Sequence, residues 1–204
     1  MPDPSLYTPA FNRMADDDVR GFVAAIAAAQ LVTVGEDDVP DATFLPVLWD
    51  GDRLLGHLAR ANSHWRRVVD GAPALAVVTG PDAYVSPSWY ASKAEHGKVV
   101  PTWNYSVVHL RGRIHVHDDP DWVLDVVTRL TDHHEAGRPA RWHVTDAPED
   151  YVRKNLRPIV GVELLVESVE AKAKLSQNRS DADRRGVAAG LAADGIEPEG
   201  LVAP

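Results

Sequence analysis

The strongest constraint on the fold is a series of strand-like segments joined by turns too short to hold a helix. Residues 42–49 and 53–59 are rich in hydrophobic residues, and only Asp50-Gly51-Asp52 separates them. An Asp-Gly turn of this kind is typical of two antiparallel strands in a hairpin. Further strands are expected at residues 31–34, 74–79, 107–116 and 159–169. Six or more antiparallel strands in one chain predict a β-barrel.

Helical segments are expected around this barrel. Asp16-Asp17-Asp18 can cap a helix whose hydrophobic residues recur at helical spacing, and Asp118-Asp119-Pro120 can open a second one. Shorter helices are expected at about residues 63–70, 148–156 and 180–195. The prediction is a mainly β, α+β fold in one domain, residues 1–204, with the last helix as a C-terminal extension.

Composition and charge exclude several classes of protein. The chain has no cysteine, which excludes disulfides, thiolate metal sites and cysteine nucleophiles. Its 21 basic and 30 acidic residues give a net charge of −9, which disfavours direct binding to nucleic acid. Residues 1–11 do not resemble a signal peptide, and the longest apolar run, residues 22–29, is too short to span a bilayer. A soluble, cytoplasmic protein without membrane contact is expected.

One strand-to-helix junction concentrates polar residues: Arg60, Asn62, Ser63 and His64 follow the strand at 53–59. The first N–H groups of a helix attract anions, and a guanidinium group is suited to phosphate. The junction therefore predicts an anion pocket. The alternative is a capped surface helix, with a solvated arginine and with Trp65 in the core.

Two further segments are candidate ligand sites. The stretch AKAKLSQNRSD (residues 171–181) places Lys172, Lys174, Ser176, Gln177 and Arg179 between the last strand and the last helix, although a polar surface loop is an equal alternative. Residues 84–105 form a long connection that contains five aromatic residues. Aromatic rings of this kind either stack on a planar ligand or pack the connection onto its own domain.

The chain offers little support for metal binding or for nucleophilic catalysis. His115 and His117 lie on the same side of a strand, but no second pair has a convincing metal-ligand spacing, so no metal site is predicted. The Gly-x-Ser-x-Gly motif of serine hydrolases is absent. No residue is an obvious acid or base: Tyr90, Lys93 and His109 are named only as guesses, and the catalytic residue stays unassigned.

Five extended motifs resemble the PaiB family, described as FMN-binding negative transcriptional regulators. They are LYTPAF (6–11), GHLARANSHW (56–65), GPDAYVSPSWY (80–90), VVPTWNYSVVHLRG (99–112) and KLSQNRSDADRRGV (174–187). Together with DHHE and the APEDY near 147–151, they cover almost the whole chain in order. Ser63 replaces the usual proline of the family and Ala171 a glycine, and neither change removes a charged group.

The resemblance implies an FMN-binding split β-barrel, normally a homodimer with FMN at the subunit interface. By analogy, the phosphate would be bound by Arg60, Asn62 and the backbone amides of Ser63 and His64. The ribityl chain or ring would lie near Thr43 and His57. The same cofactor would also be contacted by Lys174, Ser176, Gln177 and Arg179. The open face of the isoalloxazine ring would be lined by Trp89, Trp103 and Asn104.

Two classes of function follow from this resemblance. The first is a flavin-dependent oxidoreductase that acts on a small molecule, in which FMN carries the chemistry. The second is a negative transcriptional regulator or sensor that acts indirectly or through a partner. Direct binding to DNA is disfavoured, because the sequence has no helix-turn-helix signature and its net charge is negative, like that of DNA. Haem is the alternative cofactor. The substrate and the electron donor are not encoded in any recognisable motif.

Overall fold

The computed structural model describes residues 6–203, which form two compact units. The barrel unit consists of residues 23–78 and 109–169. The terminal unit consists of the described residues before 23, residues 79–108 and the described residues after 169. That the whole chain forms one domain stays a prediction.

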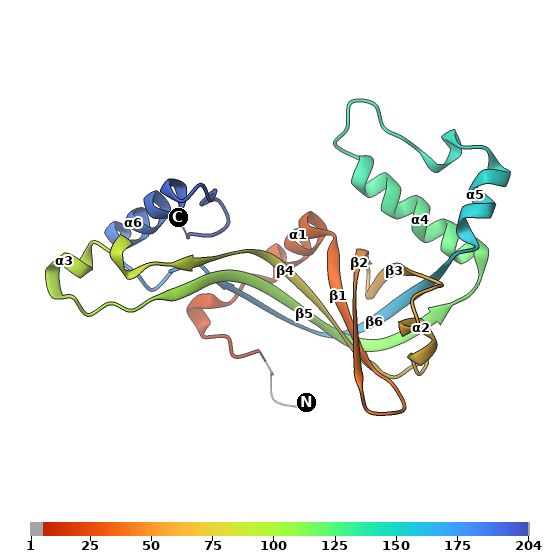
Figure 1. Ribbon diagram of the computed structural model, residues 1–204, viewed down its shortest axis with the longest axis horizontal. Helices are drawn as coiled ribbons and strands as arrows, with labels where there is room; N and C mark the ends of the chain where they lie inside the picture. Colours follow the sequence, from red (N-terminus) through yellow and green to blue (C-terminus); the bar gives the residue numbers. More distant parts are fainter. Residues whose placement is uncertain (1–5, 204) are drawn as a thin grey trace. The chain divides into compact units, whose positions relative to one another are not determined.

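Six strands form a closed antiparallel barrel (Figure 1) in the order β1-β2-β3-β6-β5-β4. Their bounds are β1 Ala28–Val34, β2 Pro40–Asp50, β3 Arg53–Ala59, β4 Pro73–Val85, β5 Thr102–His117 and β6 Ile159–Lys174. Asp50 pairs with Arg53 across the β2–β3 turn, where Gly51 has a φ of 58° that suits a glycine. The predicted hairpin and the predicted antiparallel barrel are confirmed.

Alternation along the strands separates a buried inner face from an outer face. Leu31, Leu45 and Leu54 are buried and line the barrel interior with Ile114 and Val162. Phe44 pairs with Gln30 on the outer face, where Phe44 is exposed. The inner face therefore provides the core of the barrel unit.

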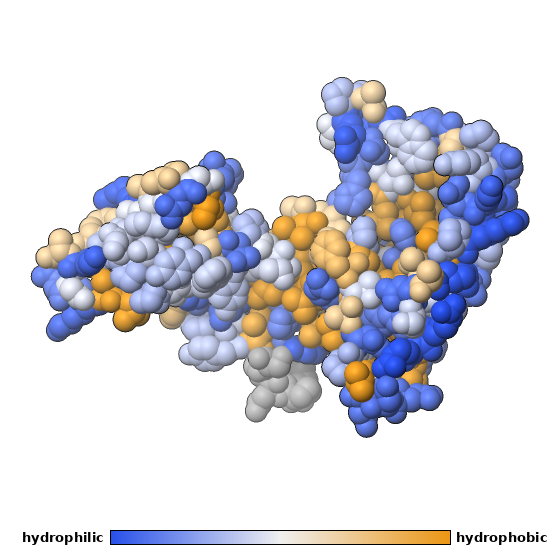
Figure 2. Space-filling model, in the orientation of Figure 1, coloured by the Kyte–Doolittle hydropathy of each residue, from blue (hydrophilic) through white to orange (hydrophobic). Residues whose placement is uncertain are grey.

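The helices lie outside the strands. They are α1 Asp16–Ile26, α2 His64–Arg67, α3 Ser92–His96, α4 Pro120–Glu135, α5 Glu149–Leu156 and α6 Asp181–Ala193, with three short 3₁₀ helices, Ala10–Asn12, Pro87–Trp89 and Val144–Asp146. Helix α4 packs Val126 and Leu130 against Leu55 of β3. Figure 2 shows hydrophobic residues gathered beside β2 and β3 at this contact. Within residues 6–203, none of the helices has the length and hydrophobicity needed to cross a bilayer.

The terminal unit has a core of its own. Its buried residues are Ala83, Val85, Tyr90, Val187, Leu191 and Leu201. Helix α6 approaches Trp89 closely, because a Cβ atom on Gly190 would lie 2.2 Å from the indole ring. Ser180 caps α6 by accepting the amide hydrogen of Asp183.

Two elements differ from their predicted lengths. The connection at 84–105 is shorter than expected, because β4 continues to Val85 and β5 begins at Thr102. Helix α2 covers only four residues instead of 63–70, since the backbone at Val68 is extended (φ −65°, ψ 123°). Arg67, the last residue of α2, forms ion pairs with Asp37 and Asp41, and such distant partners, like strand pairing, are not visible in local sequence.

Candidate functional site

The β3–α2 junction of the barrel unit is a closed hydrogen-bond network. The ring nitrogens of the buried His64 lie 2.8 Å from the hydroxyl groups of Thr33 and Thr43. Asn62 donates to the Thr43 hydroxyl at 3.1 Å and accepts the amide hydrogen of His64 at 3.0 Å. Burial lowers the pKa of His64, so its ring is neutral at pH 7. Asn62 and His64 therefore fix the loop, whereas Ser63 is exposed.

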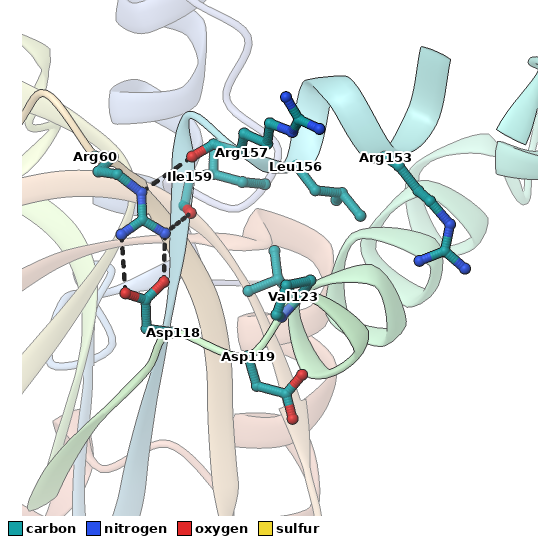
Figure 3. Close-up of a pocket in the computed structure, with 9 residues that line it drawn as sticks. Arg60, Asp118, Asp119, Val123, Arg153, Leu156, Arg157 and Ile159 are labelled. Atoms are coloured by element: carbon teal, nitrogen blue, oxygen red, sulfur yellow. Dashed lines mark hydrogen bonds and ion pairs between the residues drawn. The ribbon is translucent and has the colours of Figure 1, made fainter. Parts of the chain in front are cut away.

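Arg60 makes different contacts from those predicted for a phosphate ligand. Its guanidinium group donates two hydrogen bonds to the carboxylate of Asp118, and others to the carbonyl oxygens of Arg157 at 3.0 Å and Ile159 at 3.1 Å (Figure 3). The hydrogen bond from Arg60 lowers the pKa of Asp118. A phosphate that took both prongs of this guanidinium group would have to displace Asp118. Sequence reasoning missed Asp118, which lies 58 residues away along the chain.

The structure does not bring Thr43 and His57 together. Thr43 pairs with the buried Leu31 on the inner face of the barrel. His57 pairs with Gly161 on the outer face, where a Cβ atom on Gly161 would lie 2.1 Å from the Trp122 ring of α4. Burial lowers the pKa of His57. The two side chains therefore point to opposite faces of the sheet.

In the terminal unit, three predicted ligand residues shape the turn between β6 and α6. Asn104 and Ser176 are both buried, and the amide of Asn104 donates to the Ser176 hydroxyl at 3.0 Å and to the Leu201 carbonyl at 2.9 Å. Gln177 accepts the amide hydrogen of Leu175 at 2.7 Å. Ser176 has a φ of 65°, which is uncommon for a residue other than glycine. These contacts fix the backbone that carries the neighbouring cations.

Three cations lie on this part of the terminal unit: Lys172, Lys174 and Arg179, here called the cation group. Lys172 is only 8% exposed, and its ammonium nitrogen lies 2.8 Å from the Tyr7 carbonyl oxygen and 5.3 Å from the Tyr105 ring centre.

The other two members of the cation group also have neutral neighbours. Lys174 donates to the Trp103 carbonyl oxygen at 2.8 Å and to the Thr102 hydroxyl group. The guanidinium carbon of Arg179 lies 4.5 Å from the Tyr90 ring centre.

No member of the cation group forms an ion pair with a carboxylate anywhere in residues 6–203. Burial lowers the pKa of Lys174, Tyr105 raises it in part, and the nearby charges of Lys172 and Arg179 lower it further. The Asp183 carboxylate lies near enough to Arg179 for that charge to help lower the pKa of Asp183. Gathering three like charges is still costly, and an anion bound there would relieve that cost. The cation group therefore fits a phosphate.

Exposed aromatic rings lie in the same unit. Trp103 is 48% exposed and Tyr84 is 47% exposed, and their ring centres lie 6.1 Å apart in an edge-to-face arrangement. The indole N–H of Trp103 donates to Asp82 at 2.8 Å, which fixes the orientation of the ring. Trp89 instead packs against α6. Cations and exposed rings in one unit fit a planar cofactor that carries a phosphate, such as FMN.

The other titratable candidates have local partners. His115 lies 3.1 Å from Asp70, and His117 lies 2.8 Å from the buried Glu163. Within residues 6–203, no three histidine or carboxylate side chains gather as metal ligands. Lys93 is exposed and donates to Ser88 at 3.0 Å, which gives it a surface role.

Comparisons with known proteins agree with this architecture. Residues 6–168 match the family model described as "Putative FMN-binding domain". The chain is 31% identical over 185 residues to the protease synthase and sporulation protein PAI 2 of Bacillus subtilis, covering 87% of this chain and 85% of the relative.

Two solved structures share the fold. A conserved hypothetical protein of Mycobacterium tuberculosis has a TM-score of 0.61 and 12% identity, covering 86% of this chain and 94% of that one. An FAD and haem binding protein of Mycobacterium smegmatis has a TM-score of 0.60 and 22% identity, covering 86% of this chain and 78% of that one. At these identities the likeness concerns the fold alone.

Proposed function

Because this chain belongs to the PaiB family, which has an FMN-binding split-barrel fold, we propose that it binds FMN and acts as an FMN-dependent oxidoreductase on a small molecule. The observation that carries this proposal is the cation group, Lys172, Lys174 and Arg179, which makes no ion pair in the described chain. In a protein of net charge −9, such a group is a specific attractor for a phosphate.

Each residue of the terminal unit has a distinct role in this proposal. Lys174 and Arg179 bind the phosphate, and the buried Lys172 increases the local positive potential. Trp103 and Tyr84 cover the planar ring, with Trp103 oriented by Asp82. When bound, FMN supplies the electron-transfer chemistry, and the protein supplies binding and orientation.

The barrel unit has a supporting role at the β3–α2 junction. The network of Thr43, Asn62 and His64 fixes the loop after β3 and leaves the Ser63 hydroxyl exposed for a ligand. Arg60 maintains this region through Asp118 instead of binding the cofactor directly.

We further propose a homodimer with FMN at the subunit interface. Phe44 is 65% exposed and Val34 is 46% exposed on the outer face of the β1–β2 pair, next to the partly buried Val32. Neighbouring exposed apolar residues of this kind are typical of interaction surfaces, and two-fold dimers are the commonest oligomers.

The absorption spectrum of the purified protein, before and after incubation with FMN, tests this function. The proposal predicts flavin bands that remain after gel filtration and a cofactor that is released as FMN on denaturation. Anaerobic addition of NADH or NADPH should then bleach these bands, with dithionite as the positive control. A Soret band would favour haem, and the absence of either chromophore after incubation would contradict the proposal.

A further inference from the structure

Residues 6–13 (LYTPAFNR), here called the strap, precede α1 in the terminal unit (Figure 1). The strap includes the motif LYTPAF, to which the proposed function assigns no role. It contains the short 3₁₀ helix Ala10–Asn12, and Arg13 then forms an isolated antiparallel bridge with Lys172 of β6. This bridge places the end of the strap beside the cation group.

The strap covers the ammonium group of Lys172. The Tyr7 carbonyl oxygen accepts a hydrogen bond from Nζ of Lys172 at 2.8 Å, and the Tyr7 ring centre lies 5.9 Å from the same atom. The Tyr105 ring centre lies 5.3 Å from it. Because Lys172 is only 8% exposed, a phosphate reaches its ammonium group only if one of these covering groups moves away.

Of the two covering groups, the strap is the one that can move. Tyr105 belongs to β5, which is hydrogen-bonded to both β4 and β6. The strap lies outside the strands, and its aromatic side chains bury little apolar area, since Tyr7 is 81% and Phe11 is 53% exposed. Segments with few buried apolar contacts open at a low free energy. Tyr7 can therefore leave Lys172 while the buried Asn12 stays in place.

A phosphate bound to Lys174 competes with Tyr7 for Lys172. The two lysines are close enough for their charges to interact, so such a phosphate also attracts Lys172. That attraction adds to the hydrogen bond, whereas the Tyr7 carbonyl group carries no net charge. We propose that the strap is a lid on the cofactor site, which opens when the phosphate takes Lys172 from Tyr7. This inference rests on the proposed function and adds a moving part to the same site.

Electron paramagnetic resonance of a nitroxide on the strap tests this proposal. Because the chain has no cysteine, Thr8→Cys takes a single label next to Tyr7. We expect broad lines in the unliganded protein and narrower lines at saturating FMN, since the released strap moves faster. Riboflavin, which lacks the phosphate, should leave the lines broad. Narrow lines without a ligand, or equal narrowing by riboflavin, would overturn the proposal.

Two further variants of the Thr8→Cys chain locate the contact that closes the lid. Lys172→Met removes the ammonium group, so the lines should be narrow without a ligand and FMN should not change them. Lys98→Met removes an exposed lysine of the same unit and should behave like the parent chain. Broad lines in unliganded Lys172→Met would overturn the proposal. The titration of the parent chain decides it alone if circular dichroism shows that Lys172→Met does not fold.

The lid and the flavin proposal can fail separately. Flavin absorbance after gel filtration of the labelled protein reports whether FMN is bound. Lines that stay broad although FMN is bound would overturn the lid and leave the flavin proposal intact. If FMN does not bind, inorganic phosphate is the probe: narrowing by phosphate would support the lid without the flavin, and unchanged lines would overturn both.

Discussion

Arg60 and Asp118 form a two-pronged ion pair, with Nη1 of Arg60 3.0 Å from one carboxylate oxygen of Asp118. The same guanidinium group binds two backbone carbonyl groups at the start of β6 and just before it. Arg60 therefore links the end of β3 to the segment after β5 and to β6.

Arg60→Ala should weaken the binding of FMN and the binding of riboflavin by similar factors. Riboflavin differs from FMN only in lacking the phosphate, and the arginine acts on the fold and not on the phosphate. The unfolding midpoint should fall as well. Flavin fluorescence quenching and thermal unfolding measure both effects. Arg66→Ala is the matched control, since within residues 6–203 the Arg66 guanidinium group contacts the Trp65 ring, at 4.8 Å, and makes no ion pair. A loss confined to FMN would show that Arg60 binds the phosphate directly.

The preference for FMN over riboflavin should decrease as the pH rises, and this decrease should begin below the ordinary lysine range near 10.4. Phosphate binds the protonated ammonium group, and burial lowers the pKa of Lys174, so the unliganded protein loses this proton at a lower pH than an exposed lysine would. Lys174→Arg keeps its charge throughout this range. A ratio of affinities that declines equally in the wild type and in Lys174→Arg would exclude Lys174 as the cause.

Gly190→Ala should destabilise the terminal unit by about 1–3 kcal/mol, because overpacking forces a side chain or the backbone to move. The added methyl group would lie 2.2 Å from the Trp89 ring. Urea unfolding followed by tryptophan fluorescence measures the change. Ala189→Gly, at an exposed position of the same helix, should cost no more than the usual helix propensity, about 1 kcal/mol. No destabilisation by Gly190→Ala would contradict the close packing of Trp89.

Light scattering should give about twice the chain mass of 22.3 kDa for the wild type and the single chain mass for Phe44→Glu. The introduced carboxylate would be desolvated at the proposed apolar interface. Tyr151→Glu, which also changes an exposed aromatic residue of the barrel unit, should leave the mass unchanged. A wild-type monomer, or a dimer that tolerates Phe44→Glu, would exclude this face as the interface.

The strands were predictable because local signals agree with the tertiary structure. The Asp50-Gly51-Asp52 turn determines the β2–β3 hairpin, and the alternation of apolar residues determines which face is buried. Strand β6 was predicted too short, since its end is the charged sequence EAKAK (170–174), which has weak strand propensity. Pairing in the sheet overrides that preference.

The cofactor contacts of the candidate residues stay a prediction. Their contacts within the chain could not be predicted, because these depend on partners that are distant in sequence. Arg60 looked available for a phosphate until Asp118 was found beside it. Lys172 was predicted to lie either in a ligand site or in a polar surface loop, and it is buried against Tyr7 and Tyr105. A single sequence reports the type of charge at a position but not its counter-ion.

The most direct test of the account is a titration of Lys174→Ala with FMN and with riboflavin, followed by flavin fluorescence quenching. Lys93→Ala, which removes an exposed lysine of α3, is the control. If the cation group binds the phosphate, Lys174→Ala should weaken the affinity for FMN by about ten- to a hundred-fold and leave the affinity for riboflavin unchanged. Lys93→Ala should change neither affinity. Equal losses for the two flavins, or no loss for FMN, would contradict the central claim that these cations bind the cofactor phosphate.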